Sequence, residues 1–159
     1  MIKISLNGNW DFIADLDPKY HGYKLHYPVH PYSQADLNRR HWLKIQVPGV
    51  WQKYAERYDI FEGVCWYARE FELEAPVPGN ARLRFGGVNY FCEVYINDKY
   101  LGSHEGGYTE FVLNASGKLK SGKNHIAVMV DNRATKIKWP PCLGYFKCHL
   151  RHRKRMQYQ

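Results

Sequence analysis

Apolar and polar residues alternate with a period of two along most of the chain after residue 40. In each of several short runs, the apolar residues share one face, and in most of these runs charged or polar residues occupy the other. Such alternation is typical of β-strands that turn one face toward a core. The runs are Leu43, Ile45 and Val47; Phe71 and Leu73; Ala81, Leu83 and Phe85; Cys92, Val94 and Ile96; and Ile126, Val128 and Val130.

Turn signals separate these runs, and no segment shows the spacing of an amphipathic helix. Pro48-Gly49 ends one run, residues 97–99 form a hairpin signal, and residues 120–124 predict a turn. Residues 15–38 lack periodicity and predict a long loop between a first strand near residues 10–14 and the next strand. The pattern therefore predicts an all-β fold, an antiparallel β-sandwich or jelly roll.

The charge of the chain lies at one end. The 159 residues suit a single domain with a net charge of +8. Residues 1–132 hold 15 Lys/Arg and 15 Asp/Glu, whereas residues 133–159 hold 8 Lys/Arg and no acid. Because the body is neutral, we expect no nucleic-acid site on it. The 13 tyrosines and 5 tryptophans suit sheet cores and also surfaces that face sugars.

The four cysteines lack the spacing of a zinc site or of a disulfide framework, and they are Cys65, Cys92, Cys142 and Cys148. We therefore expect free thiols, no metal and no cofactor. No apolar run approaches the roughly 18 residues of a membrane span, so we expect no membrane partner. The first residues lack the apolar stretch of a signal peptide, which favours a cytoplasmic location.

Seven segments, in order, resemble the sugar-binding domain that opens family 2 glycoside hydrolases. Among them are Gly-Val-Cys-Trp-Tyr-Ala-Arg-Glu-Phe and His-Glu-Gly-Gly-Tyr, and the latter resembles the β-glucuronidase branch more than the β-galactosidase branch. The resemblance implies a jelly-roll β-sandwich similar to galactose-binding domains. The segments are Leu6–Phe12, Val47–Trp51, Gly63–Phe71, Leu83–Val88, Val94–Asn97, Leu101–Phe111 and Asn124–Asn132.

The same resemblance implies that catalysis belongs to other domains. In this family an immunoglobulin-like domain and a (β/α)₈ barrel follow, and the barrel holds two glutamates for retaining hydrolysis. A barrel needs about 250 residues, more than the whole chain contains. We therefore expect a noncatalytic carbohydrate-associated domain that lacks the barrel and is inactive alone. Its implied partners are a β-glycoside and the missing domains.

Four residues are candidates for carbohydrate contact. In the family, polar residues from loops of this domain reach the substrate sugar, and Asp131 and Asn132 end a strand at such a loop. Capping of the strand end is the alternative role for both. Trp51 and Tyr58 follow Pro48-Gly49 on a loop, so we expect them to be exposed aromatics, although core packing is the alternative for Trp51.

The loop from His104 to Tyr108 is expected to have a structural role. Glu105 beside His104 resembles a catalytic acid, but a lone carboxylate cannot run either glycosidase scheme. We expect Gly106 and Gly107 to adopt positive φ in a tight loop, and Glu105 to cap backbone donors.

The resemblance covers residues 1–141, and residues 142–159 form a basic tail that does not match. Three interpretations of the tail stay open: a frameshifted or premature end of a longer gene, a basic arm for nucleic acid or an anionic surface, and a genuine ending of this chain. The first is favoured because it also explains the missing barrel. Two other functions stay open as well, a stand-alone carbohydrate-binding module and a basic-tailed interaction protein.

Overall fold

The computed structural model describes residues 3–14, 42–54, 61–74, 77 and 79–133. The predicted loop at 15–38, the candidate Tyr58 and the tail at 142–159 therefore lie outside the described residues. Within the described ranges, no helix is long and apolar enough to cross a membrane.

The described residues contain eight strands. A 3₁₀ turn at Trp51–Lys53 follows the second of them. The strands are β1 (Gly8–Ala14), β2 (Leu43–Val47), β3 (Val64–Leu73), β4 (Arg82–Phe85), β5 (Phe91–Ile96), β6 (Lys99–Glu105), β7 (Phe111–Asn114) and β8 (Gly122–Asp131).

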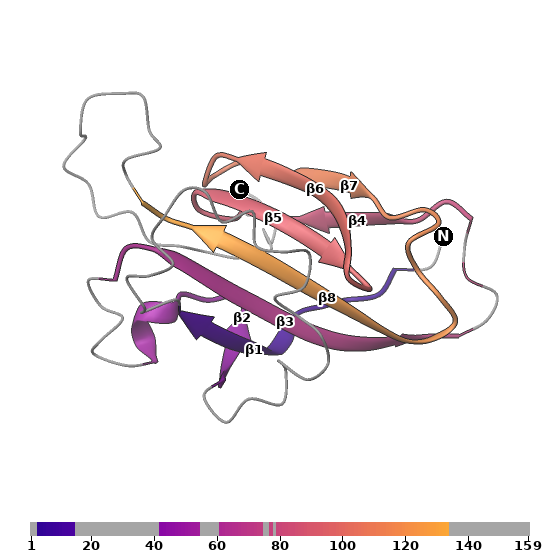
Figure 1. Cartoon of the computed structure of the whole chain (residues 1–159), viewed down its shortest axis with the longest axis horizontal. Helices are drawn as coiled ribbons and strands as arrows, with labels where there is room; N and C mark the ends of the chain where they lie inside the picture. Colours follow the sequence, from indigo (N-terminus) through magenta and orange to yellow (C-terminus); the bar gives the residue numbers. More distant parts are fainter. Residues whose placement is uncertain (1–2, 15–41, 55–60, 75–76, 78, 134–159) are drawn as a thin grey trace, which may run out of the picture.

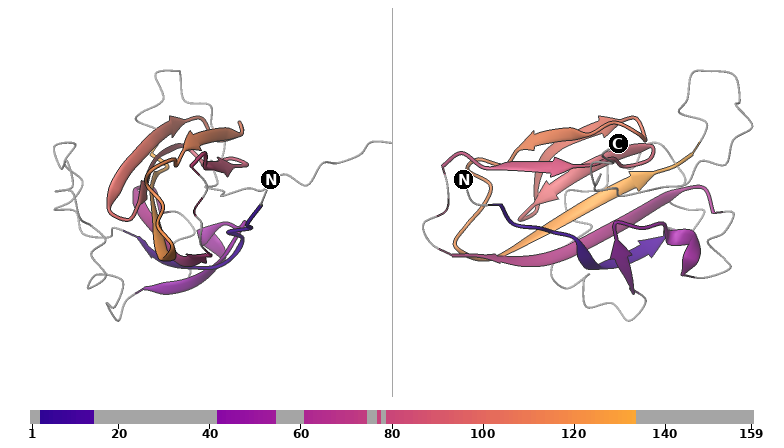
Figure 2. Two further views of the ribbon diagram at one scale, coloured as in Figure 1. Left: turned by 90° about the vertical axis from the view of Figure 1, so that its right-hand side faces the viewer. Right: turned by 180° about the vertical axis from the view of Figure 1, so that it is seen from behind.

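The strands form two antiparallel sheets. Six of them form one sheet in the order β2-β1-β3-β8-β5-β6, and β4 pairs with β7 in a second, smaller sheet (Figure 1). Seen along the strands, the large sheet curves and the β4–β7 pair faces its concave side (Figure 2). Neighbours in the sheet such as β3 and β8 are far apart in the sequence, as in a jelly roll. The predicted all-β antiparallel jelly-roll sandwich is confirmed.

The main core fills the space between the two sheets. It holds the apolar faces that the alternation predicts, including Ile45 and Val47 on β2 and Cys92, Val94 and Ile96 on β5. Phe85 of β4 and Phe111 of β7 stack at 4.7 Å between ring centroids and close the core from the other side. Burial of these side chains is the main source of stability.

A second apolar cluster lies on the opposite, outer face of the large sheet. Val64, Trp66 and Ala68 of β3 and Ala127 and Met129 of β8 are all buried there. Residues 64–68 of β3 and 126–130 of β8 are thus buried on both faces, which explains why these parts of the two central strands read as continuous apolar runs.

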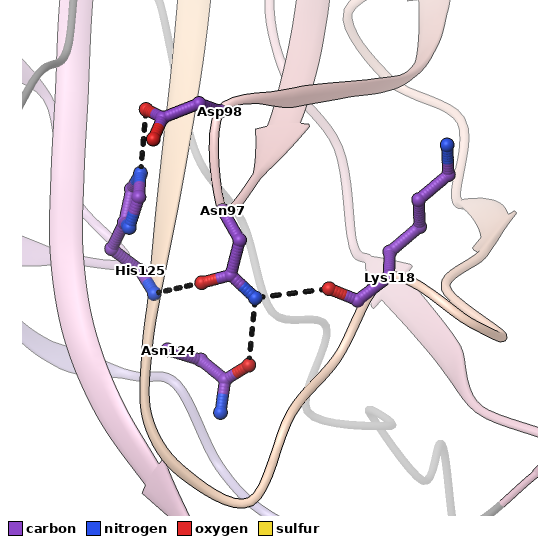
Figure 3. Close-up of polar contacts among 5 residues, drawn as sticks. All are labelled: Asn97, Asp98, Lys118, Asn124 and His125. Carbon is purple, nitrogen blue, oxygen red and sulfur yellow. Dashed lines mark hydrogen bonds and ion pairs between the residues drawn. The ribbon is translucent and has the colours of Figure 1, made fainter.

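The β5–β6 hairpin turns at Asn97 and Asp98, as the sequence predicts. Both residues have positive φ, 48° and 63°, which a two-residue hairpin turn of the primed type requires. His125 Nε2 lies 2.9 Å from Asp98 Oδ1, and the Asn97 amide donates to Lys118 O at 2.9 Å (Figure 3). The hairpin tip is therefore fastened to the start of β8.

The turn predicted at residues 120–124 ends earlier than expected, because β8 begins at Gly122. Asn124 lies within the strand and is buried. Its side-chain oxygen accepts from Lys120 N at 2.9 Å and from the Asn97 amide at 2.8 Å. Buried polar side chains need such partners, and one asparagine here joins two turns.

Cys65 and Cys92 are not in a disulfide bond, and both are buried in the main core. Each pairs in register with Val130 of β8, on opposite sides of it, so the two cysteines are separated by a whole strand. Burial raises the pKa of the Cys92 thiol from 9.0 to about 12. The thiol therefore stays protonated at neutral pH and serves as a small apolar side chain.

Alkaline pH is expected to destabilise the domain through Cys92. A raised folded-state pKa means that the stabilisation is fully present below pH 9 and is lost as pH rises toward 12. Between pH 9 and 11 the loss of unfolding free energy should be roughly 2 kcal/mol. Urea unfolding should show that the free energy of unfolding, relative to its value at pH 7, falls more steeply with pH for the native chain than for Cys92→Ala. Equal falls in the two proteins would contradict the raised pKa of Cys92.

Candidate functional site

Four strand ends meet at one end of the large sheet, where β6 and β8 finish and β3 and β5 begin. The register aligns one residue from each strand in a single row: Val64, Asp131, Phe91 and Glu105. We call these four residues the strand-end row. Residues far apart in the sequence thus reach one surface, and the loop at 104–108 continues from it.

An ion pair holds the carboxylate of Asp131 within this row. Arg133 Nε lies 3.0 Å from Asp131 Oδ1, and a terminal guanidinium nitrogen lies 2.7 Å from Oδ2. The backbone N–H of Arg133 also donates to Oδ1 at 3.1 Å. The Asp131 residue is only 2% exposed. This forked geometry uses both carboxylate oxygens, so Asp131 is oriented by its own chain.

Asn132 fastens the end of β8 to the entry of β3. Its Oδ1 accepts from Gly63 N at 2.8 Å, and its Nδ2 donates to Phe61 O at 3.2 Å. Its backbone N–H donates to Gly63 O at 3.3 Å. Both predicted polar candidates therefore end β8 as expected, and both show the capping contacts that were the alternative role.

Glu105 is exposed and bonds to Tyr90, which precedes β5. The hydrogen bond to the Glu105 carboxylate is the main cause that raises the pKa of the Tyr90 phenol above its usual value. Gly106 N donates to Tyr90 O at 2.9 Å, which fixes the loop against the same residue. The Glu105 carboxylate thus has a phenol as a partner, and its capping of backbone donors stays a prediction.

The glycines of this loop differ in their roles. Gly106 has φ of +123°, as predicted, but Gly107 does not adopt the left-handed region. A Cβ at Gly107 would lie 2.5 Å from Asn89 Oδ1, so this position needs glycine for close packing. The expectation of positive φ at Gly107 is wrong.

The two aromatic ends of the loop differ in their exposure. His104 is half-buried, its ring stacks on Phe111 at 4.1 Å between ring centroids, and its Nε2 lies 3.1 Å from Thr109 Oγ1. Tyr108 is 74% exposed. Tyr108 is therefore an aromatic surface that a sugar ring can reach from this loop.

Trp51 is buried completely, and the expectation of an exposed aromatic at this position is wrong. The 3₁₀ turn that follows Val50 directs the indole into the main core. Its ring lies 5.8 Å from that of Phe12 and 6.3 Å from that of Phe61. A tryptophan without exposed surface cannot stack on a sugar, so Trp51 is a core residue. The other aromatic candidate, Tyr58, lies outside the described residues.

Sequence reasoning missed two members of this site, Tyr90 and Arg133. The pairing of Tyr90 with Glu105 depends on the β5–β6 register, which the sequence does not show before the strands are paired. Arg133 carried a usable signal, because a guanidinium two residues after Asp131 can fold back onto it. Among the described residues, no group of three or more His, Cys, Asp and Glu is arranged to hold a metal ion.

Comparison with known proteins assigns the chain to a family. The family model described as glycosyl hydrolases family 2, sugar binding domain, matches residues 3–146. A β-galactosidase from Thermoanaerobacter pseudethanolicus is 29% identical over 140 residues, which cover 84% of this chain and 17% of that protein. A β-glucuronidase from Bacteroides fragilis is 26% identical over 147 residues, which cover 90% of this chain and 18% of that protein.

Solved structures agree with this match. The β-glucuronidase of Bifidobacterium dentium, solved with coumarin-3-O-glucuronide, superposes with a TM-score of 0.64 at 32% identity over 80% of this chain and 20% of that one. The chain spans between 12% and 22% of the length of the curated relatives it matches. The chain belongs to glycosyl hydrolase family 2, as a sugar-binding domain of that family.

Proposed function

We propose that this chain is the noncatalytic carbohydrate-associated domain of a β-glycosidase that acts on β-glucuronides or β-galactosides. The family match over residues 3–146 carries the proposal, and relatives bearing both enzyme names support the substrate class. On sequence grounds the proposed domain spans residues 1–141 and residues 142–159 are a tail, while the family match continues to residue 146.

Within this function, the strand-end row and the loop at 104–108 form the surface that faces the sugar. Glu105 and Tyr108 are exposed there, and they supply a hydrogen-bond acceptor and an aromatic face. Asp131 and Asn132 act as positioning residues, because their side chains hold Arg133 and the entry of β3. Tyr58 stays a candidate contact on sequence grounds.

NMR titration of the whole chain tests this function. Methyl β-D-glucuronide or methyl β-D-galactoside should bind at millimolar concentration and shift amide signals of residues 104–108 and 131–133. Aryl β-glycosides should not be hydrolysed, since Asp131 is engaged by Arg133 and Glu105 alone does not make a glycosidase pair in the strand-end row.

Tyr108→Ala should remove the shifts at the loop, because the aromatic face is lost. Tyr100→Ala is the matched control, since Tyr100 is also an exposed tyrosine but lies toward the opposite end of the β5–β6 hairpin. Micromolar affinity would favour a stand-alone carbohydrate-binding module instead. Turnover of an aryl glycoside by the chain, or shifts that survive Tyr108→Ala, would contradict the proposal.

A further inference from the structure

A row of aromatic side chains crosses the outer face of the large sheet and ends at an exposed tyrosine. Trp66 of β3 lies 6.0 Å from Tyr95 of β5, measured between ring centroids. Tyr95 lies 5.7 Å from Tyr100 of β6, with the two rings inclined at 68° in an edge-to-face arrangement. Trp66 is buried and Tyr100 is 52% exposed. Because β6 is an edge strand of this sheet, small molecules can reach the ring of Tyr100.

Polar groups lie beside this ring on the same face. The Tyr95 hydroxyl donates to Glu93 Oε2 at 2.7 Å, and Ser103 pairs in register with Glu93. Burial, followed by the hydrogen bond to Glu93, raises the pKa of Tyr95, so the phenol keeps its proton at neutral pH. The Glu93–Ser103 pair therefore lies two β5 residues from the Tyr95–Tyr100 pair on the same face of the sheet, and the phenol of Tyr95 bonds to the carboxylate of Glu93.

The hairpin that carries Tyr100 is rigidly supported at its tip. The Asn97 side chain accepts from His125 N at 3.1 Å and donates to Asn124 Oδ1, while Asp98 pairs with His125 (Figure 3). Tyr100 follows this turn by two residues, and its ring is also held by the edge of Tyr95. A recognition group that is already ordered loses little conformational entropy when it binds a ligand.

We propose that Tyr100, Glu93 and Ser103 form a platform that binds a neutral pyranose ring. A pyranose combines an apolar C–H face, which stacks on an aromatic ring, with rim hydroxyls that donate to a carboxylate and exchange hydrogen bonds with a serine. The Glu93 carboxylate repels an anionic sugar at this position, so the platform selects against uronic acids.

The aromatic member of this platform lies further along the sheet than the surface assigned under the proposed function. Tyr100 pairs with Tyr95, which is four residues, roughly 13 Å, from Phe91 on β5, whereas Glu93 and Ser103 lie two residues, roughly 7 Å, from the strand-end row. The inference therefore goes beyond the proposed function and can stand or fall without it.

Two ligands that differ only at C6 test the platform: methyl β-D-glucoside, which is neutral, and methyl β-D-glucuronide, which carries a carboxylate. In NMR titrations of the whole chain, the glucoside should shift amide signals of residues 93–103, and the glucuronide should shift them much less. Tyr100→Ala should weaken glucoside binding there roughly tenfold, since the stacking face is lost. Glu93→Gln should reduce the difference between the shifts caused by the glucoside and by the glucuronide, because the repelling charge is removed.

Tyr108→Ala serves as the matched control, because it removes an exposed tyrosine from the other surface and should leave the shifts at 93–103 unchanged. Thermal unfolding should give the same midpoint for Tyr100→Ala as for the native chain, and Ser103→Ala provides a second, smaller change if it does not. Glucoside shifts that persist in Tyr100→Ala, or equal response to both ligands, would overturn the platform. Loss of the 104–108 response alone would count against the proposed function and leave the platform standing.

Discussion

Replacing Trp51 by alanine is expected to destabilise the domain by about 3–5 kcal/mol. The side chain is fully buried and packs against the rings of Phe12, Phe61 and Tyr67. Removal of a buried indole loses its transfer free energy and leaves a cavity that a close-packed core fills only in part. Urea unfolding followed by circular dichroism measures the change.

Trp51→Phe is the matched variant, because it keeps an aromatic ring in the core and should lose much less stability than the alanine variant. Tyr54→Ala is the control on the neighbouring exposed side, since Tyr54 is 36% exposed. If Trp51→Ala kept native stability but lost sugar binding, Trp51 would be a surface contact after all and its burial would be refuted.

The strand pattern was predictable wherever one face of a strand meets the core and the other meets solvent. Cys92, Val94 and Ile96 alternate in the sequence and are all buried in the main core. The hairpin at Asn97 was predictable because asparagine and aspartate tolerate positive φ in a two-residue turn. In such places local propensity and tertiary packing favour the same conformation.

Local pattern was less informative where packing decides the direction of a side chain. Trp51 follows a Pro-Gly pair, which predicts a loop, but a loop residue can still turn inward, and a large apolar ring is stabilised by doing so. Gly107 is of a residue type common in turns, yet glycine is needed here because the side chain of Asn89, from another segment, packs against it. Neither contact exists before the sheets assemble.

The candidate site shows the same division between local and long-range information. The position of Asp131 and Asn132 at a strand end follows from the alternation that precedes them. Their partners depend on which strands pair, because Asn132 contacts Gly63 across β3 and β8. Sequence reasoning therefore placed Asp131 and Asn132 at the end of a strand, while the identity of their partners required the register.

The ion pair of Asp131 with Arg133 gives the second large effect. Arg133→Ala is expected to reduce the free energy of unfolding by about 3–5 kcal/mol, because it leaves a carboxylate that is 2% exposed without its forked partner. Asp131→Asn in the same chain should recover part of this loss, since the neutral amide has a much smaller desolvation cost. The four-member cycle of native, single and double variants, measured by urea unfolding at pH 7, gives the coupling between the two residues. Additive losses, with no recovery in the double variant, would show that the two side chains do not act as a pair.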